Sequence, residues 1–354
     1  MTIDLIRQHK LSHFFGEDDK TTFPLTLWFD SAKEGKDFAN LLMRNRDHFT
    51  CAGANLGNIL DSSLKYVKHK TDYRKGVYWP LVDIHKMRVL DSKIIAPHSI
   101  TELSQWQHHD FVIAKNQDPM FAVEVTEHIL TWNNVAQRLP RMVLSASNTV
   151  PSAILQKFNE KTTDKHKGWF LQAFSKSSEI FKTPCVALMF KEDNREDQAK
   201  VLSDLSCDLL EYICYDSTEA LKRMNEHLWS IAEDNQKVAN KLYAANPLLP
   251  CKWLTITPEE VRVFIGVRPE DSMWNTKGTG GLDPYPGLVL LADMLLCRTG
   301  PKRTDRSRKL VVEFKNLKRD FWWFAKYPDE LYLQLLIDKD KRIADEVVFK
   351  RGSA

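Results

Sequence analysis

The chain has 354 residues and a formal net charge of +3, and its hydrophobic and charged fractions, 43% and 27%, are ordinary for a globular protein. No stretch approaches the roughly 18 consecutive apolar residues of a membrane span, and the amino terminus lacks the basic start and apolar run of a signal peptide. The six cysteines are scattered without a Cys-x-x-Cys pair, which argues against a zinc site and favours reduced thiols in a cytoplasmic protein. The mild positive charge does not by itself indicate a nucleic-acid partner, so only local clustering of basic residues bears on that question.

The first hundred residues mix helix-like stretches with loops. Residues 31–49 fit a helix whose apolar side includes Phe38 and Leu41, and strand-like runs follow at 77–84 and 88–95. These elements carry no motif of their own, so they predict structure rather than function.

Residues 110–127 form the most informative segment. Two apolar runs are joined by a polar turn at 116–119, which predicts a β-hairpin. Asp110 opens the first strand, and Glu124 lies inside the second, where alternation puts it on the same face as Thr126. An unpaired carboxylate is costly to bury between apolar neighbours, whereas two carboxylates on adjacent strands can hold a hard cation such as Mg²⁺. The pattern therefore predicts a Mg²⁺ site at Asp110 and Glu124.

A helix is expected to start near Thr131, directly after the acidic strand. Asn134, Arg138 and Arg141 share one of its faces, because they follow one another at helical spacing. Pro140 should kink or interrupt this helix. Guanidinium groups bind phosphate oxygens bidentately, so this polar face is predicted to contact DNA.

The chain continues with alternating strands and helices. Strands are predicted at 150–155 and 182–190, with a helical stretch at 168–181 between them. From 195 to 243 apolar residues recur at helical spacing, which predicts helix. Ser217 or Thr218 can cap the start of a helix within this stretch.

The stretch Asn246-Pro247-Leu248-Leu249-Pro250 is a natural boundary. We therefore expect an α/β domain at 1–195, a helical connection at 196–245 and a smaller carboxy-terminal α/β module at 246–354.

The carboxy-terminal module contains a second acidic motif. Strands are predicted at 261–267 and 310–315, and the second carries Glu313-Phe314-Lys315, an acidic-x-Lys string. The upstream Asp293 has leucine neighbours at helical spacing, which places it on a helix rather than on an adjacent strand. We therefore expect Glu313 and Lys315 to support binding or stability rather than to hold the cation.

Basic residues are concentrated between 298 and 309, and this loop, with Arg303 and Arg306 in it, is predicted to contact DNA phosphates. The glycine-rich loop at 278–281 lacks the Gly-Lys-Ser/Thr ending of a phosphate-binding loop, so no nucleotide cofactor is expected.

The hairpin and the helix behind it resemble the PD-(D/E)xK nuclease superfamily, in particular the type II restriction endonucleases. Members of that superfamily carry an Asp and a Glu on adjacent strands of a small mixed sheet, followed by a helix. Asp110 matches the motif Asp, and Glu124 matches the motif Glu. The sequence departs from the motif at Thr126, where the family usually has Lys, and at His109, where it has Pro.

The resemblance implies a restriction-endonuclease-like α/β fold, a mixed sheet flanked by helices. It also implies a Mg²⁺-dependent type II enzyme of restriction–modification that cleaves double-stranded DNA at a specific site as a homodimer. Asp110, Glu124 and Glu127 would form the catalytic group. Glu127, Lys115 and Lys157 are the candidates for the role of the missing Lys.

Two other interpretations stay open at this point. The first is a non-catalytic DNA-binding or defence protein on a degenerate nuclease fold, which the missing Lys supports. The second is a different metal-dependent nuclease that acts on structured or damaged DNA, or on RNA.

Overall fold

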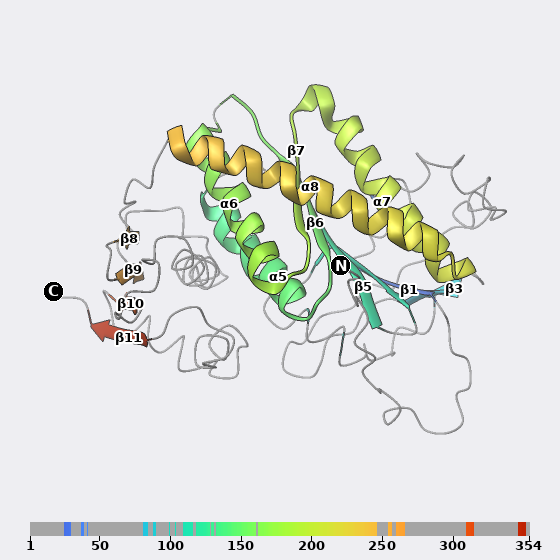
Figure 1. The fold of residues 1–354 in the computed structure, drawn as a ribbon, viewed down its shortest axis with the longest axis horizontal. Helices are drawn as coiled ribbons and strands as arrows, with labels where there is room; N and C mark the ends of the chain where they lie inside the picture. Colours follow the sequence, from blue (N-terminus) through green and yellow to red (C-terminus); the bar gives the residue numbers. More distant parts are fainter. Residues whose placement is uncertain are drawn as a thin grey trace, which may run out of the picture.

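A computed structural model gives the fold of the chain (Figure 1). The structure describes a continuous central portion and a set of shorter segments on either side of it. They are residues 25–29, 37–38, 41, 81–83, 88–89, 99, 103, 109–115, 118–127, 129–130, 132–160, 162–245, 254–256, 260–265, 309–314 and 346–351.

A seven-stranded mixed sheet organises the central portion, with the strand order β3-β2-β1-β4-β5-β6-β7. Neighbours from β3 to β5 pair antiparallel, whereas β5, β6 and β7 pair parallel. The α/β class predicted from the sequence is therefore confirmed. The strands are β1 (Leu25–Phe29), β2 (Leu81–Asp83), β3 (Arg88–Val89), β4 (Phe111–Lys115), β5 (Asp118–Thr126), β6 (Ser152–Lys157) and β7 (Cys185–Phe190).

In the described part of the chain, the sheet is flanked by helices α5 (Trp132–Ser147), α6 (Asp164–Phe181), α7 (Arg195–Tyr215) and α8 (Thr218–Ala245). A short 3₁₀ turn, η1 (Glu192–Asn194), precedes α7. Helices α5 and α6 connect parallel neighbouring strands that progress in one direction, and right-handed crossovers place both on the same face. The side chains of α7 pack on the other face.

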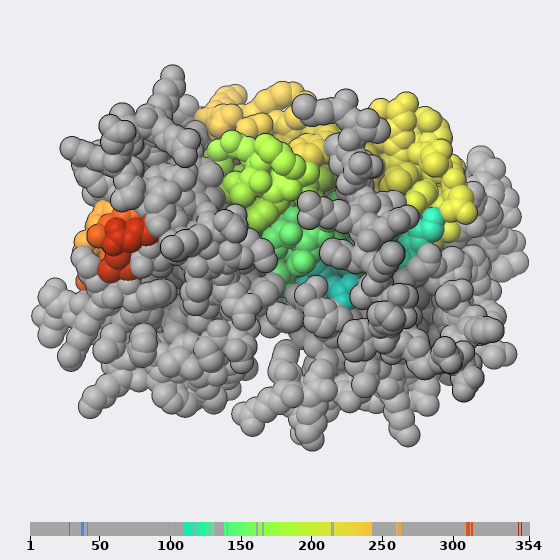
Figure 2. Space-filling model, turned by 60° about the horizontal axis from the view of Figure 1, so that its bottom comes forward, coloured from blue at the N-terminus to red at the C-terminus, as the bar shows by residue number. Residues whose placement is uncertain are grey.

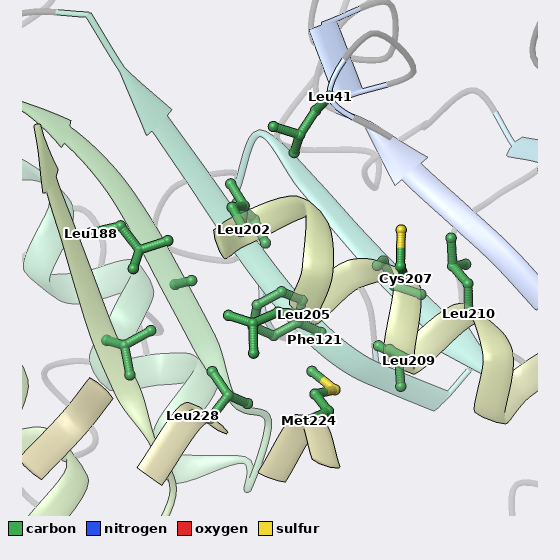
Figure 3. Close-up of a cluster of buried hydrophobic side chains, with 14 of the residues drawn as sticks. Leu41, Phe121, Leu188, Leu202, Leu205, Cys207, Leu209, Leu210, Met224 and Leu228 are labelled. Atoms are coloured by element: carbon green, nitrogen blue, oxygen red, sulfur yellow. The ribbon is translucent and has the colours of Figure 1, made fainter. Parts of the chain in front are cut away.

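The core on the α7 side joins sheet and helices in a single hydrophobic cluster. Figure 3 shows Leu202, Leu205 and Leu209 of α7 beside Phe121 of β5, with Met224 of α8 close by. The region 196–245, expected as a connection between domains, is thus part of the core of the seven-stranded sheet. Its apolar spacing serves that burial, and each fully buried leucine contributes roughly 1.5–3 kcal/mol.

Helix α8 also protects the open edge of the sheet. It packs along α6 and passes β7, the last strand of the order. The Asn235 amide accepts a hydrogen bond from the Ala187 N–H (2.7 Å) and donates one to the Ala187 carbonyl (3.1 Å). A side chain here satisfies the strand-edge backbone that would otherwise pair with another chain.

Replacing Asn235 with Ala should lower the free energy of unfolding by about 1–3 kcal/mol, because the partly buried backbone groups of Ala187 lose their partner. Urea denaturation measures the loss. The matched control is Gln236→Ala, an exposed amide on the same helix that should change stability by less than about 0.5 kcal/mol. Equal stability of the two variants would mean that the amide does not hold the strand edge.

The elements expected from the sequence are largely observed. The hairpin is formed by β4 and β5, and α5 runs from Trp132 to Ser147 without the interruption that we expected at Pro140. Ser217 accepts a hydrogen bond from the Ala220 N–H and so caps α8, as predicted. Of the helix predicted at 31–49, the described residues are helical, and both Phe38 and Leu41 are buried.

A smaller mixed sheet lies in the carboxy-terminal part, with the order β11-β10-β9-β8. Its strands are β8 (Leu254–Ile256), β9 (Glu260–Ile265), β10 (Lys309–Phe314) and β11 (Glu346–Arg351). In the space-filling view β10 and β11 appear in orange and red, apart from the green and yellow of helices α6 to α8 (Figure 2). The strands predicted around 261–267 and 310–315 are confirmed, whereas the helix expected at 287–297 lies outside the described residues.

Within the described ranges, no helix is both long enough and apolar enough to cross a membrane.

Candidate functional site

The hairpin brings Asp110 and Glu124 to the same end of its ladder. Phe111 on β4 pairs with Val123 on β5 as the last pair at this end, and Asp110 and Glu124 directly adjoin that pair. The Asp110 carboxylate accepts a hydrogen bond from the Val125 N–H at 2.5 Å. The two carboxylates predicted from the sequence are therefore brought together at one end of the hairpin.

Glu124 is buried, with 2% of its surface exposed. Both of its carboxylate oxygens face arginines of α5. Arg141 donates a hydrogen bond to one oxygen, and the Nε of Arg138 lies 3.3 Å from the other. Burying a carboxylate without a partner is costly, and these two guanidinium groups remove that cost.

Arg138 interacts electrostatically with both carboxylates. Burial is the largest influence on the pKa of Arg138 and lowers it; Glu124 and Asp110 raise this pKa, and Arg141 lowers it. An arginine remains protonated in proteins despite such shifts. Asp110, Glu124, Arg138 and Arg141 thus form one charged group, called the carboxylate–arginine cluster below, with a formal charge of zero.

A polar stripe on α5 holds this helix against the hairpin. Arg138, Arg141 and Ser145 recur at the i, i+3 and i+7 positions that share a helix face. Ser145 lies 2.9 Å from the Nε2 atom of His109, and both residues are fully buried. His109 therefore anchors the start of β4 to α5 immediately beside Asp110. The sequence does not predict this contact, because His109 and Ser145 lie 36 positions apart.

A positive charge from α5 lies beside Thr126 of β5. Thr126 is buried on the Glu124 face of β5, and Arg138 donates a hydrogen bond from Nη2 to the Thr126 hydroxyl at 2.8 Å. Gln156 of β6 pairs in register with Thr126, so its side chain lies on the same face of the sheet. The guanidinium of Arg138 thus lies against the Thr126 hydroxyl as well as beside Glu124.

The three candidates named for the role of the Lys lie elsewhere. Lys115 is at the opposite end of β4, 2.7 Å from Asp216 and over the ring of Tyr212. Lys157 alternates onto the α7 face of β6 and pairs with the Glu192 carboxylate at 2.5 Å.

Glu127 is likewise separated from the carboxylate pair. It follows the end of β5, is 52% exposed at its side chain, and pairs with Arg195 at the start of α7 at 2.5 Å. The structure thus groups Asp110 with Glu124 but not with Glu127.

The structure describes only some of the residues that were predicted to contact DNA. Arg138 and Arg141 belong to the cluster, and Asn134 lies in the first turn of α5, with its side chain outside the described set. Arg303 and Arg306 also fall outside the described residues, as do Asp293 and Lys315.

Glu313, the acidic residue of the second motif, is paired within its own sheet. Arg262 of β9 donates to the Glu313 carboxylate at 2.9 Å and also contacts Glu260. Its neighbours in the described part of β9 and β10 thus give Glu313 a basic partner rather than a second acidic one.

Metal-ligating groups are sparse in the part of the chain that the structure describes. There, no three His, Cys, Asp or Glu side chains gather closely enough to hold a metal ion. Asp110 and Glu124 provide two hard oxygen ligands, so a cation between them would complete its coordination with water and phosphate oxygens, as Mg²⁺ usually does.

Comparisons with known proteins give no family for this chain. No protein-family profile, no curated protein and no solved structure matches it.

Proposed function

We propose that this chain is a Mg²⁺-dependent endonuclease that cleaves double-stranded DNA, of the type II restriction class. The observation that carries the proposal is the hairpin, which brings Asp110 and Glu124 to the same end of its ladder, with two arginines of α5 on the Glu124 carboxylate. Opposed carboxylates next to guanidinium groups suit phosphodiester chemistry, because they can hold a cation and a phosphate at adjacent positions.

The donor set fits a hard cation. Asp110 and Glu124 would hold Mg²⁺ through carboxylate oxygens, and such an ion activates water and stabilises the charge on the leaving oxygen. Arg138 and Arg141 would orient the phosphate. His109 and Ser145 act as positioning residues, because their buried contact fixes the distance between β4 and α5.

The direct test of this function uses supercoiled plasmid DNA incubated with the full chain, with and without Mg²⁺. We expect linear product only with the cation, and sequencing of the ends should give one recurrent site. Glu127→Gln should keep this activity, because Glu127 pairs with Arg195 away from the cluster. Cleavage that persists in excess chelator would contradict a metal-dependent mechanism.

Arg141 is expected to contribute one phosphate contact. Arg141→Gln should reduce the slope of log binding constant against log salt by roughly one unit. Fluorescence anisotropy of a labelled duplex measures the slope. Arg223→Gln is the matched control, because Arg223 pairs with Asp208 and Glu211 between α7 and α8. An unchanged slope in Arg141→Gln would remove α5 from the DNA interface.

A second candidate function is DNA binding without cleavage, on a degenerate nuclease fold. The observation that favours it is the pairing of both Glu124 oxygens with arginines, together with Thr126 at the Lys position. A protein of this kind would bind duplex DNA with the salt dependence described above and leave plasmid intact in every divalent cation tested.

A further inference from the structure

The two arginines that neutralise Glu124 are the same groups that the proposed function directs to phosphate. A guanidinium that turns toward phosphate leaves a carboxylate oxygen of Glu124 in need of a positive partner, since that oxygen is buried.

We propose that DNA and the divalent cation bind this site cooperatively, with Arg141 acting as the exchangeable partner of Glu124. This inference rests on the proposed function and adds its regulation. Without DNA the carboxylate–arginine cluster is formally neutral and attracts a cation weakly. Phosphate draws Arg141 away, the cluster becomes negative, and the cation replaces the guanidinium at Glu124.

The geometry assigns the exchange to Arg141 rather than to Arg138. Arg138 is the more buried of the two, with 11% of its side chain exposed against 19% for Arg141. Arg138 is also fixed by a second contact, to the Thr126 hydroxyl. Arg141 is therefore the more accessible of the two to a phosphate from solvent, while the Thr126 hydroxyl helps to hold Arg138 in its place.

Thermodynamic linkage makes the proposal quantitative. If DNA tightens cation binding by a given factor, the cation must tighten DNA binding by the same factor. Binding at one coupled site typically changes the affinity of the other site 5–150-fold. We therefore expect DNA to tighten cation binding, and the cation to tighten DNA binding, by about tenfold or more.

The test measures binding of Ca²⁺ to the full chain by isothermal titration calorimetry, with and without a short DNA duplex. Ca²⁺ takes the same oxygen ligands as Mg²⁺, and gel electrophoresis establishes that the duplex stays intact during the titration. In the wild-type protein we expect the duplex to tighten Ca²⁺ binding about tenfold or more. Anisotropy titrations of the labelled duplex should give the same factor for Ca²⁺.

The decisive variant is Arg141→Gln. It should bind Ca²⁺ about tenfold tighter than the wild type without DNA, and the duplex should then add little. Arg223→Gln should behave like the wild type, because Arg223 pairs with Asp208 and Glu211 instead. Thermal melting of each variant verifies that the comparison is made between folded proteins.

The contradicting outcomes separate the coupling from the function. If Ca²⁺ binds the wild type and Arg141→Gln equally, with no effect of DNA, and binding is lost in Asp110→Asn, the coupling is wrong while the metal site stands. If no variant binds Ca²⁺ with or without DNA, the proposed nuclease function is itself overturned.

Discussion

Asp110→Asn should reduce Mg²⁺-dependent plasmid cleavage to below about one-hundredth of the wild-type rate. Loss of a contact beyond the metal ligands already costs 10–100-fold, and Asp110 is proposed to be a ligand itself. The fold should persist, because the Asn carbonyl oxygen can still accept the hydrogen bond from the Val125 N–H. The measurements are the initial rate of plasmid nicking and the midpoint of thermal unfolding.

The matched control for this variant is Asp216→Asn. Asp216 lies at the end of α7 in a left-handed conformation that Asn tolerates, and it is largely exposed beside Lys115. It should cleave DNA at the wild-type rate. An Asp110→Asn protein that folds and cleaves as fast as the wild type would show that the hairpin is not the active site.

Glu124→Ala should destabilise the protein by about 3–5 kcal/mol, the cost of leaving a buried ion pair without one partner. The two guanidinium groups of Arg138 and Arg141 would remain in a site with little water and no carboxylate between them. Urea denaturation measures this loss.

Two comparisons make the stability test specific. Glu127→Ala removes an exposed carboxylate whose surface ion pair with Arg195 contributes at most about 1 kcal/mol. The triple variant Glu124→Leu, Arg138→Leu and Arg141→Leu removes every charge of the buried pairs. It should recover part of the stability that Glu124→Ala loses. Wild-type stability in Glu124→Ala would mean that the arginines find other partners and that the cluster is not a structural unit.

The sequence was sufficient to place the carboxylate pair. Turn residues at 116–119 define the hairpin, and alternation determines which side chains share a face. Both signals are local, because the two strands are joined by a short turn. This is why Asp110 and Glu124 could be predicted to lie at the same end of a hairpin. The alternation of side chains likewise predicts that Glu124 and its apolar neighbours in the sequence face opposite sides of the sheet.

The partners of that pair could not be predicted in the same way. The helical spacing of Arg138 and Arg141 gives their common face but not which strand that face covers. Likewise, the contact of His109 with Ser145 and that of Asn235 with Ala187 join residues 36 and 48 positions apart. Such contacts depend on how the crossover helices dock, which short-range periodicity does not contain.

The surface against which 196–245 packs could not be predicted for a related reason. An amphipathic pattern such as Leu202, Leu205 and Leu209 predicts burial against some apolar surface without naming it. In the structure this surface is the face of the seven-stranded sheet opposite Glu124 (Figure 3). The helices therefore complete the sheet domain, which also explains how α8 comes to cover the edge of β7.

The central claim, that Asp110 and Glu124 hold a divalent cation, is tested most directly by crystallography of the full chain with Mn²⁺ and a short DNA duplex. The account predicts an anomalous-scattering peak about 2.0–2.6 Å from carboxylate oxygens of both residues, with Arg141 turned from Glu124 to a phosphate. A duplex-bound structure with no peak at this position, and with both arginines still on Glu124, would contradict it.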